Sequence, residues 1–186
     1  MVPIINFQNL FNGKTLNGWK MAGKGSFAIL QNENVLQTQG GMGLLWYYKR
    51  KFKDFILGLE WKASSNGDNS GVFVRFPNPE NDPYVAVSYG YEIQIGDLAQ
   101  PDGKPIHGTG AIYDFAAPSI KESKPTGEWN SLQIIAEKQK YTVMANGITV
   151  ISNFTGNRSL EGYIGLQNHD DRSKVFFRNI RVREIS

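Results

Sequence analysis

The stretch Tyr91-Glu92-Ile93-Gln94-Ile95-Gly96-Asp97 has the alternating pattern of a β-strand. Successive side chains of a strand point to opposite faces of a sheet, so Ile93 and Ile95 share one face while Glu92 and Gln94 share the other. Such a strand packs its isoleucines into a core and presents a carboxylate and an amide together. The polar face is either half solvated or the floor of a polar site.

Further strand signals recur along the chain at spacings of about 8–12 residues, which is typical of an all-β sandwich. The segment 54–63 is predicted as a long strand, and Asn146-Gly147 predicts a two-residue hairpin turn. The best helix candidate, 115–124, is interrupted by Pro118. With about twelve such strands and no repeat or linker, the sequence predicts one antiparallel sandwich domain over residues 1–186.

The composition is that of a globular protein, because 40% of the 186 residues are hydrophobic and 20% are charged. The net charge of +3 comes from scattered basic residues, and the densest run, 49–53, favours a lysine-bearing strand edge over a nucleic-acid patch. The chain contains no cysteine, which excludes disulfides, thiolate zinc sites and a cysteine nucleophile.

The sequence also bears on the membrane and on localisation. No apolar run approaches the roughly 20 residues that span a bilayer, so we expect no membrane span. Residues 1–5 are too short for the apolar core of a signal peptide. We therefore expect either a cytoplasmic protein or a mature chain to which a start methionine has been added.

Several short motifs follow one another in a fixed order along nearly the whole chain. They are LFNGKTLNGW at 10–19, SGVFVR at 70–75, YEIQIGD at 91–97, TGAIY at 109–113, GEWN at 127–130, NG at 146–147, GYIGLQNH at 162–169 and FRNIR at 177–181. In this order they resemble the 3-keto-disaccharide hydrolase domain family. The resemblance implies a concanavalin A-like jelly-roll sandwich of two antiparallel sheets that acts on carbohydrates, with 3-keto-glycosides as substrates. Members of the family are commonly exported.

In a sandwich of this kind, the outward residues of the concave sheet line a sugar-sized groove. Strand parity nominates the following residues for that face and its rim, with Glu92 and His169 as candidate catalytic residues and the others as substrate-binding residues: Glu92, Gln94, Arg75, Gln167, His169, Tyr113 and Asp97. An exposed aromatic side chain would add a stacking platform for the sugar, but the sequence does not identify which one.

Each candidate also has a purely structural interpretation. Glu92 could be a solvated strand carboxylate, Arg75 could simply pair with it, and His169 could cap a turn. His107, in a Pro/Gly-containing loop, could belong to a lid. A divalent cation is the one cofactor left open: Asp170-Asp171 offers hard oxygen ligands, although a hydrated turn is the alternative.

The expected chemistry depends on the number of carboxylates. Ordinary glycosidases use two, whereas the second polar position of this strand is Gln94, which is neither an acid nor a nucleophile. In a 3-keto sugar, the ketone acidifies the proton on C2, so a single base can start an elimination of the glycosidic oxygen. Glu92 or His169 could be that base, and Arg75, Gln94 or a bound cation could stabilise the enolate.

Three functions remain open from the sequence: an enzyme that cleaves 3-keto-glycosides, a lectin-like carbohydrate-binding module, and an interaction domain without catalysis. Convergence of Glu92, Arg75 and His169 in one closed pocket would favour the enzyme, and their scattering would favour neither the enzyme nor the binding module. A shallow open groove with exposed aromatic residues would favour binding. In the first two cases the expected partner is a carbohydrate rather than a nucleic acid.

Overall fold

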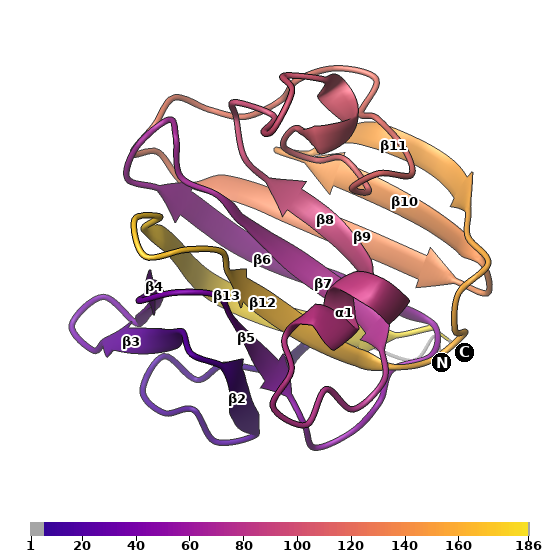
Figure 1. Cartoon of the computed structure of the whole chain (residues 1–186). Coiled ribbons are helices and arrows are strands. Elements are labelled where there is room, and N and C mark those ends of the chain that lie inside the picture. Colours follow the sequence, from indigo (N-terminus) through magenta and orange to yellow (C-terminus); the bar gives the residue numbers. More distant parts are fainter. Residues whose placement is uncertain (1–5, 186) are drawn as a thin grey trace.

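The computed structural model describes residues 6–185, which fold into two antiparallel sheets packed face to face (Figure 1). The eight-stranded sheet has the order β11-β10-β9-β6-β13-β4-β3, and β1 pairs with β13 beside this path. Its strands are β1 (Gln8–Asn9), β3 (Ser26–Leu30), β4 (Val35–Gln39), β6 (Phe55–Ala63), β9 (Asn130–Glu137), β10 (Lys140–Ala145), β11 (Ile148–Thr155) and β13 (Val175–Glu184). The predicted all-β sandwich of two antiparallel sheets is confirmed.

The five-stranded sheet has the order β2-β5-β12-β7-β8. Its strands are β2 (Trp19–Gly23), β5 (Gly43–Tyr47), β12 (Tyr163–Asn168), β7 (Ser70–Phe76) and β8 (Tyr91–Ile95). The two helical segments are α1 (Tyr84–Tyr89) and the 3-10 turn η1 (Pro105–His107), and neither is long and apolar enough to cross a membrane. The segment 115–124 forms no helix, in keeping with Pro118.

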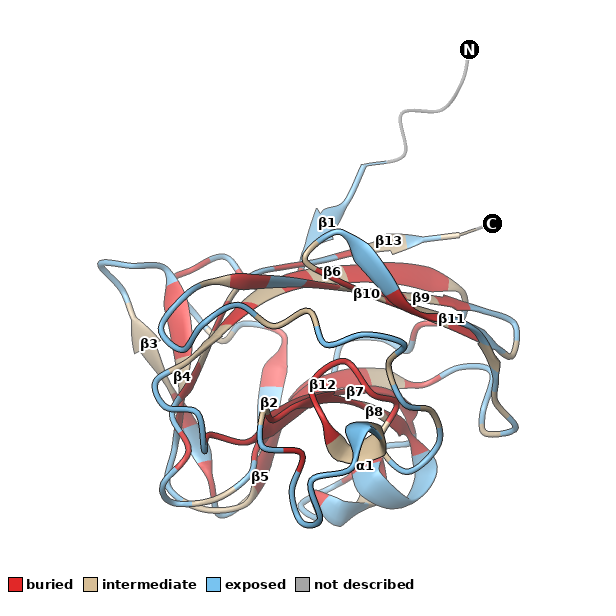
Figure 2. Ribbon diagram, turned by 90° about the horizontal axis from the view of Figure 1, so that it is seen from above, coloured by how far each residue is buried: buried red, intermediate tan, exposed pale blue. Residues whose placement is uncertain are grey.

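The main core lies between the sheets, where buried strand residues of both layers meet (Figure 2). From β8, Ile93 and Ile95 point into this core, as their parity predicts, and they pack with Val72 of β7 and Leu57 of β6. Burying an aliphatic side chain of this size contributes about 1.5–3 kcal/mol. This packing fixes the register of β8, so that Glu92 and Gln94 must face outward from the five-stranded sheet.

A second, smaller apolar cluster covers part of that outward face. Trp46, Phe73 and Phe76 pack there against Ala86 of α1, which lies on the outer side of the five-stranded sheet (Figure 2). The sequence did not predict this helix, because six residues between a proline-rich loop and a strand carry too little periodicity. The helix covers one part of the face and borders the remaining polar part.

The structure corrects the expectation that Arg75 shares the outward face with Glu92. Arg75 lies where β7 bulges against β12, since Tyr163 pairs with Phe76 but Ile164 pairs with Val74. Its φ of +57° turns the side chain inward, and the residue is 0% exposed. Counting alternate residues along β7 therefore fails at this position.

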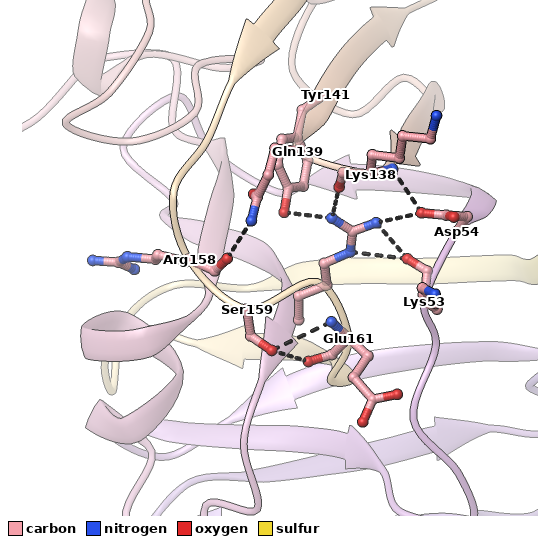
Figure 3. A network of polar contacts seen from close by, with 9 residues as sticks. Lys53, Asp54, Lys138, Gln139, Tyr141, Arg158, Ser159 and Glu161 are labelled. Atoms are coloured by element: carbon pink, nitrogen blue, oxygen red, sulfur yellow. Dashed lines mark hydrogen bonds and ion pairs between the residues drawn. The ribbon is translucent and has the colours of Figure 1, made fainter.

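Four of the residues labelled in Figure 3 hold the buried guanidinium of Arg75, namely Lys53, Asp54, Lys138 and Tyr141. It donates hydrogen bonds to the carbonyl oxygens of Lys53 and Lys138 and to the Tyr141 hydroxyl, which lies 2.9 Å away. The carboxylate of Asp54 lies 3.1 Å from it and compensates its charge. Arg75 is therefore a structural residue that joins β7 to the eight-stranded sheet.

We predict that Arg75→Met destabilises the protein by about 3–5 kcal/mol, because it leaves Asp54 and two carbonyl oxygens without their buried partner. Urea unfolding followed by circular dichroism measures this change. Lys174→Met, at an exposed position of the β12–β13 connection, serves as the control and should change stability by less than about 0.5 kcal/mol. A loss for Arg75→Met as small as that of the control would contradict the structural role.

Candidate functional site

The polar part of the outward face forms one depression of about 310 Å³. Its floor is built by Glu92 and Gln94 of β8, Gln167 of β12, His169 just after β12 and Asn69 just before β7. Its walls are Met42, Tyr84, Val87 and Tyr113. The structure thus brings together five of the residues expected from the sequence: Glu92, Gln94, Gln167, His169 and Tyr113.

A missing side chain on the neighbouring strand makes room for Glu92. Gly71 of β7 pairs with Gln94, and a Cβ atom placed on Gly71 would lie 2.2 Å from Oε1 of Glu92. The carboxyl group therefore lies directly over this glycine. A glycine inside a strand often marks such a close approach, and this was the signal in the sequence that could have identified Gly71.

The carboxyl group of Glu92 has an unusual environment. Burial in the floor, followed by the negative charge of Asp114, raises its pKa from 4.5 to about 8, although a hydrogen bond from Gln167 acts in the opposite direction. At neutral pH this carboxyl group is mainly protonated. It can therefore donate a proton to a bound molecule.

Gln94 supplies a hydrogen-bond donor to the same floor. Its Oε1 accepts a hydrogen bond of 3.3 Å from the backbone N–H of Ile95, which directs the amide so that Nε2 is the group left to donate. The side chain is buried, so this donor has a fixed position. Such a donor suits an oxygen atom that gains negative charge during a reaction.

His169 is paired with an ionised carboxylate. Its Nδ1 lies 2.8 Å from Oδ2 of Asp170. Burial raises the pKa of Asp170, but hydrogen bonds from His169, Ser173 and Arg172 outweigh it and hold this pKa at about 2. The pairing places the Nδ1–H bond toward Asp170 and leaves Nε2 as the basic nitrogen of the neutral ring.

Asp170 itself is held by its own turn. Its Oδ1 accepts hydrogen bonds of 2.7 Å from the backbone of Arg172 and Ser173, and its Oδ2 accepts one of 3.0 Å from the Ser173 hydroxyl. These bonds are those of the turn interpretation considered for Asp170. Within residues 6–185, no group of three or more His, Cys, Asp and Glu residues could hold a metal ion. The residues present do not fit the metal site considered at Asp170-Asp171.

Tyr113 forms the wall next to Glu92. Its backbone N–H donates a 2.9 Å hydrogen bond to the carbonyl oxygen of Glu92, and Ile112 bridges to Ile93, so this segment lies along the open edge of β8. His107 lies behind this wall: its ring centroid is 4.7 Å from that of Tyr113. His107 does not line the depression, contrary to the idea of a lid residue.

The nitrogens of His107 are held between two carboxylates. Nδ1 lies 2.6 Å from Asp102 and Nε2 lies 2.8 Å from Asp114. The hydrogen bond to Asp102, and then the one to Asp114, raises the pKa of His107. Through these two contacts, His107 links Asp114, which acts electrostatically on Glu92, to Asp102 in the preceding loop.

Two of the residues expected from the sequence lie elsewhere. Asp97 accepts a 2.6 Å hydrogen bond from the Thr109 hydroxyl and lines a different cavity of about 400 Å³, and Arg75 is buried between the sheets. The sequence analysis missed Asn69, Met42, Tyr84 and Val87. They come from a turn, a loop and a helix, where strand parity makes no prediction.

Comparison with known proteins bears on this site. The sequence model of the 3-keto-alpha-glucoside-1,2-lyase-like domain matches residues 6–183. The chain belongs to this family. A curated relative, the 3-keto-disaccharide hydrolase of Bacteroides thetaiotaomicron, is 27% identical over 228 aligned positions that cover 95% of this chain and 77% of the relative. Family and relative together identify a carbohydrate-active protein of the glycosyl hydrolase type.

Solved structures show the same sandwich. A Parabacteroides distasonis protein provisionally named a glycosyl hydrolase is 25% identical, with a TM-score of 0.77 over 97% of this chain and all of that chain. The carbohydrate-binding module CBM66 of Bacillus subtilis is 15% identical, with a TM-score of 0.65 over 90% of this chain and 96% of that chain. At 15% identity, the likeness to CBM66 concerns the fold alone.

We predict that Glu92 makes wild-type stability fall as pH rises from about 5 to about 8. The unfolded carboxyl group ionises near 4.5 but the folded one only near 8, so over this range the folded state holds a proton that the unfolded state has lost. Relative to Glu92→Gln, the wild type should lose more than about 1 kcal/mol of unfolding free energy. Urea denaturation across this pH range measures this loss. Parallel curves of unfolding free energy against pH for the wild type and Glu92→Gln would contradict the raised pKa of Glu92.

We also predict that Gly71→Ala displaces the Glu92 carboxyl group toward solvent and lowers its pKa. Carbon-detected NMR titration of the glutamate carboxyl groups measures this pKa without any substrate. Gly58→Ala, at a strand glycine of β6 where the nearest atom to the new Cβ would lie 3.6 Å away, is the matched control. An unchanged Glu92 pKa in Gly71→Ala would show that the carboxyl group does not depend on the space above the glycine.

Proposed function

We propose that the protein cleaves the glycosidic bond of 3-keto-glycosides by proton abstraction and elimination. The observation that carries the proposal is the pairing, in one depression, of a protonated carboxyl group at Glu92 with a carboxylate-oriented imidazole at His169. The carboxyl group can serve as the acid, and the imidazole, oriented through its Nδ1 by Asp170, can serve as the base.

In the first step, Nε2 of His169 removes the proton from C2, next to the ketone at C3. The electron pair of the C–H bond forms an enolate, whose oxygen accepts a hydrogen bond from Nε2 of Gln94. The enolate then expels the glycosidic oxygen from C1, and Glu92 gives its proton to that leaving oxygen. The products are an unsaturated ketone and the free alcohol or sugar.

In the second step, water adds across the new C1–C2 double bond. The Glu92 carboxylate takes a proton from the water as its oxygen bonds to C1, and protonated His169 returns a proton to C2. Both groups regain their starting protonation states, and the net reaction is hydrolysis. Release of the unsaturated ketone before this step would make the same site a lyase.

The arrangement does not suit the two-carboxylate mechanism of ordinary glycosidases. Among the described residues that line the depression, Glu92 is the sole carboxylate, because Gln94 is an amide and Asp97 lines another cavity. A double displacement needs a second carboxylate as nucleophile or base. The elimination needs one acid and one base, the roles that we assign to Glu92 and His169.

The test compares cleavage of a 3-keto-α-glucoside with that of the unoxidised glucoside. We predict cleavage of the keto sugar alone, and losses of about 10²- to 10⁴-fold in kcat for Glu92→Gln and for His169→Gln. Wild-type kcat/KM should fall above about pH 8, since the ionised Glu92 no longer donates a proton, and this fall should be absent in Glu92→Gln. Glu137→Gln, at an exposed position of β9, is the control.

Two results would overturn the proposal. Cleavage that persists in Glu92→Gln and His169→Gln would remove both groups from the chemistry. Binding of glycosides without any cleavage, measured by calorimetry, would instead favour a lectin-like carbohydrate-binding module.

A further inference from the structure

The outward side of the eight-stranded sheet lies opposite to α1 and to the Glu92 depression (Figure 2). It contains a hollow of about 170 Å³ at the position where the central strand β6 carries Gly58. A Cβ atom placed on Gly58 would meet nothing nearer than Nε of Arg181, 3.6 Å away. Gly58 pairs with Gln133 of β9 on one side and with Arg181 of β13 on the other. The missing side chain therefore leaves an open space between two polar residues.

Polar groups line this space, which we call the Gly58 hollow. Gln133 contributes an amide, Ser131 a hydroxyl group and Arg181 a guanidinium group, and Met144 adds an apolar wall. Amide and hydroxyl groups can both donate and accept hydrogen bonds, as the hydroxyl groups of a sugar require. A guanidinium group only donates, and it binds a carboxylate through two parallel hydrogen bonds. The hollow thus combines one position for an anion with positions for hydroxyl groups.

The two arginines beside the Gly58 hollow differ in their partners. Nε of Arg178 lies 2.6 Å from Oε2 of Glu60. Burial raises the pKa of Glu60, but hydrogen bonds from Arg178 and Asn179 and the charges of Arg178 and Arg181 outweigh it, so this carboxyl group stays ionised. Within residues 6–185, Arg181 forms no ion pair. One carboxylate between two guanidinium groups leaves a unit of positive charge without a partner in this wall.

A bulge in β13 keeps its arginines on the outward face. Arg178 pairs with Glu60 and Arg181 with Gly58, so β13 advances by three residues where β6 advances by two, and Asn179 has a φ of +54°. In a regular strand, residues three apart point to opposite faces. Arg183 follows two residues after Arg181, which is about 6.5–7 Å along the strand. Three guanidinium groups therefore follow one another across the outward face.

Aromatic rings lie beside these guanidinium groups. The ring centre of Phe7 lies 5.2 Å from Cζ of Arg181 and 5.6 Å from Cζ of Arg183. At the other end, the ring centre of Trp129 lies 3.9 Å from Cζ of Arg178. Such rings add apolar contact area next to each positive charge. Cations beside apolar rings suit a ligand that has both anionic groups and C–H faces.

We propose that this face binds an acidic polysaccharide and that the Gly58 hollow receives one uronate unit of it. The carboxylate of that unit pairs with Arg181, and its hydroxyl groups bind to Gln133 and Ser131. The adjoining units lie along the other arginines of β13 and the rings beside them. This face is opposite to the Glu92 depression, so binding here does not depend on the chemistry proposed there.

The Gly58 hollow favours a sugar acid over a nucleic acid. Its volume of about 170 Å³ admits a single ring, and the amide and hydroxyl groups beside Arg181 match the hydroxyl groups of a sugar. Glu60, in its wall, repels the closely spaced phosphates of a nucleic acid. A uronate polymer carries its carboxylates one ring apart, with neutral hydroxyl groups between them.

The test measures, by calorimetry at low ionic strength, the binding of tetragalacturonate and of the same tetrasaccharide with methyl-esterified carboxyl groups. The acid should bind more tightly than the ester by about tenfold or more, because the ester cannot pair with Arg181. Arg181→Gln should lower the affinity for the acid by about tenfold. Gly58→Val should cause a similar loss, because it fills the hollow without changing any charge. Arg172→Gln, at an exposed position outside the hollow, is the control and should leave the affinity unchanged.

Several results would overturn this inference. Equal affinity for acid and ester would remove the carboxylate from recognition, and full affinity in a folded Gly58→Val would reduce binding to diffuse attraction. If thermal melting shows that Gly58→Val is unfolded, Gln133→Leu provides the second test of the hollow, and full affinity in that variant counts equally against it. A single-stranded oligonucleotide that binds as tightly as the acid would show a general polyanion surface.

Two further measurements separate this face from the Glu92 depression. Glu92→Gln should bind tetragalacturonate as the wild type does, and a loss of binding in this variant would place the glycan in the Glu92 depression instead. Arg181→Gln should cleave a 3-keto-α-glucoside at the wild-type rate if the proposed function holds. Absence of cleavage in every variant and the wild type would remove the proposed function and leave the binding results on this face as they are.

Discussion

The guanidinium of Arg75 connects the two sheets at one end of the sandwich. It reaches from β7 to the backbone of Lys53 and Lys138 and to the side chains of Asp54 and Tyr141, all in or beside strands of the eight-stranded sheet. A buried charge needs such a complete set of partners, because an incomplete set leaves it uncompensated in a medium of low dielectric constant. The bulge that turns Arg75 inward also shifts the register of β7 against β12, whereas the regular pairing of β7 with β8 places Gly71 beneath Glu92.

On the outward face of the same sheet, the surroundings shift the pKa values of two carboxyl groups, Glu92 and Asp170, in opposite directions. Glu92 lies in a recess near apolar side chains and keeps its proton, whereas Asp170 lies in a turn rich in N–H groups and loses it. His169 stands between these environments, tied to Asp170 and facing the recess of Glu92. Which carboxyl group of the site is protonated and which is ionised therefore depends on backbone geometry as much as on residue type.

Much of this site could be predicted from the alternation of strand side chains. The parity of β8 places Glu92 and Gln94 on the outward face, and the spacing of Gln167 and His169 brings them to the same depression. The parity rule failed for Arg75, because a bulge adds a residue and reverses the direction of the side chain. It made no prediction for Tyr84 and Asn69, whose positions depend on tertiary packing of a short helix and a turn.

The segment 110–113, which runs along β8, also covers the edge of the five-stranded sheet. β8 is the last strand of its sheet, and such an edge can recruit strands from other molecules. Here the backbone of Gly110, Ala111 and Tyr113 pairs with the N–H and C=O groups of Gln94 and with the C=O group of Glu92. The loop that shapes the pocket thus also blocks the addition of a foreign strand at this edge of the five-stranded sheet.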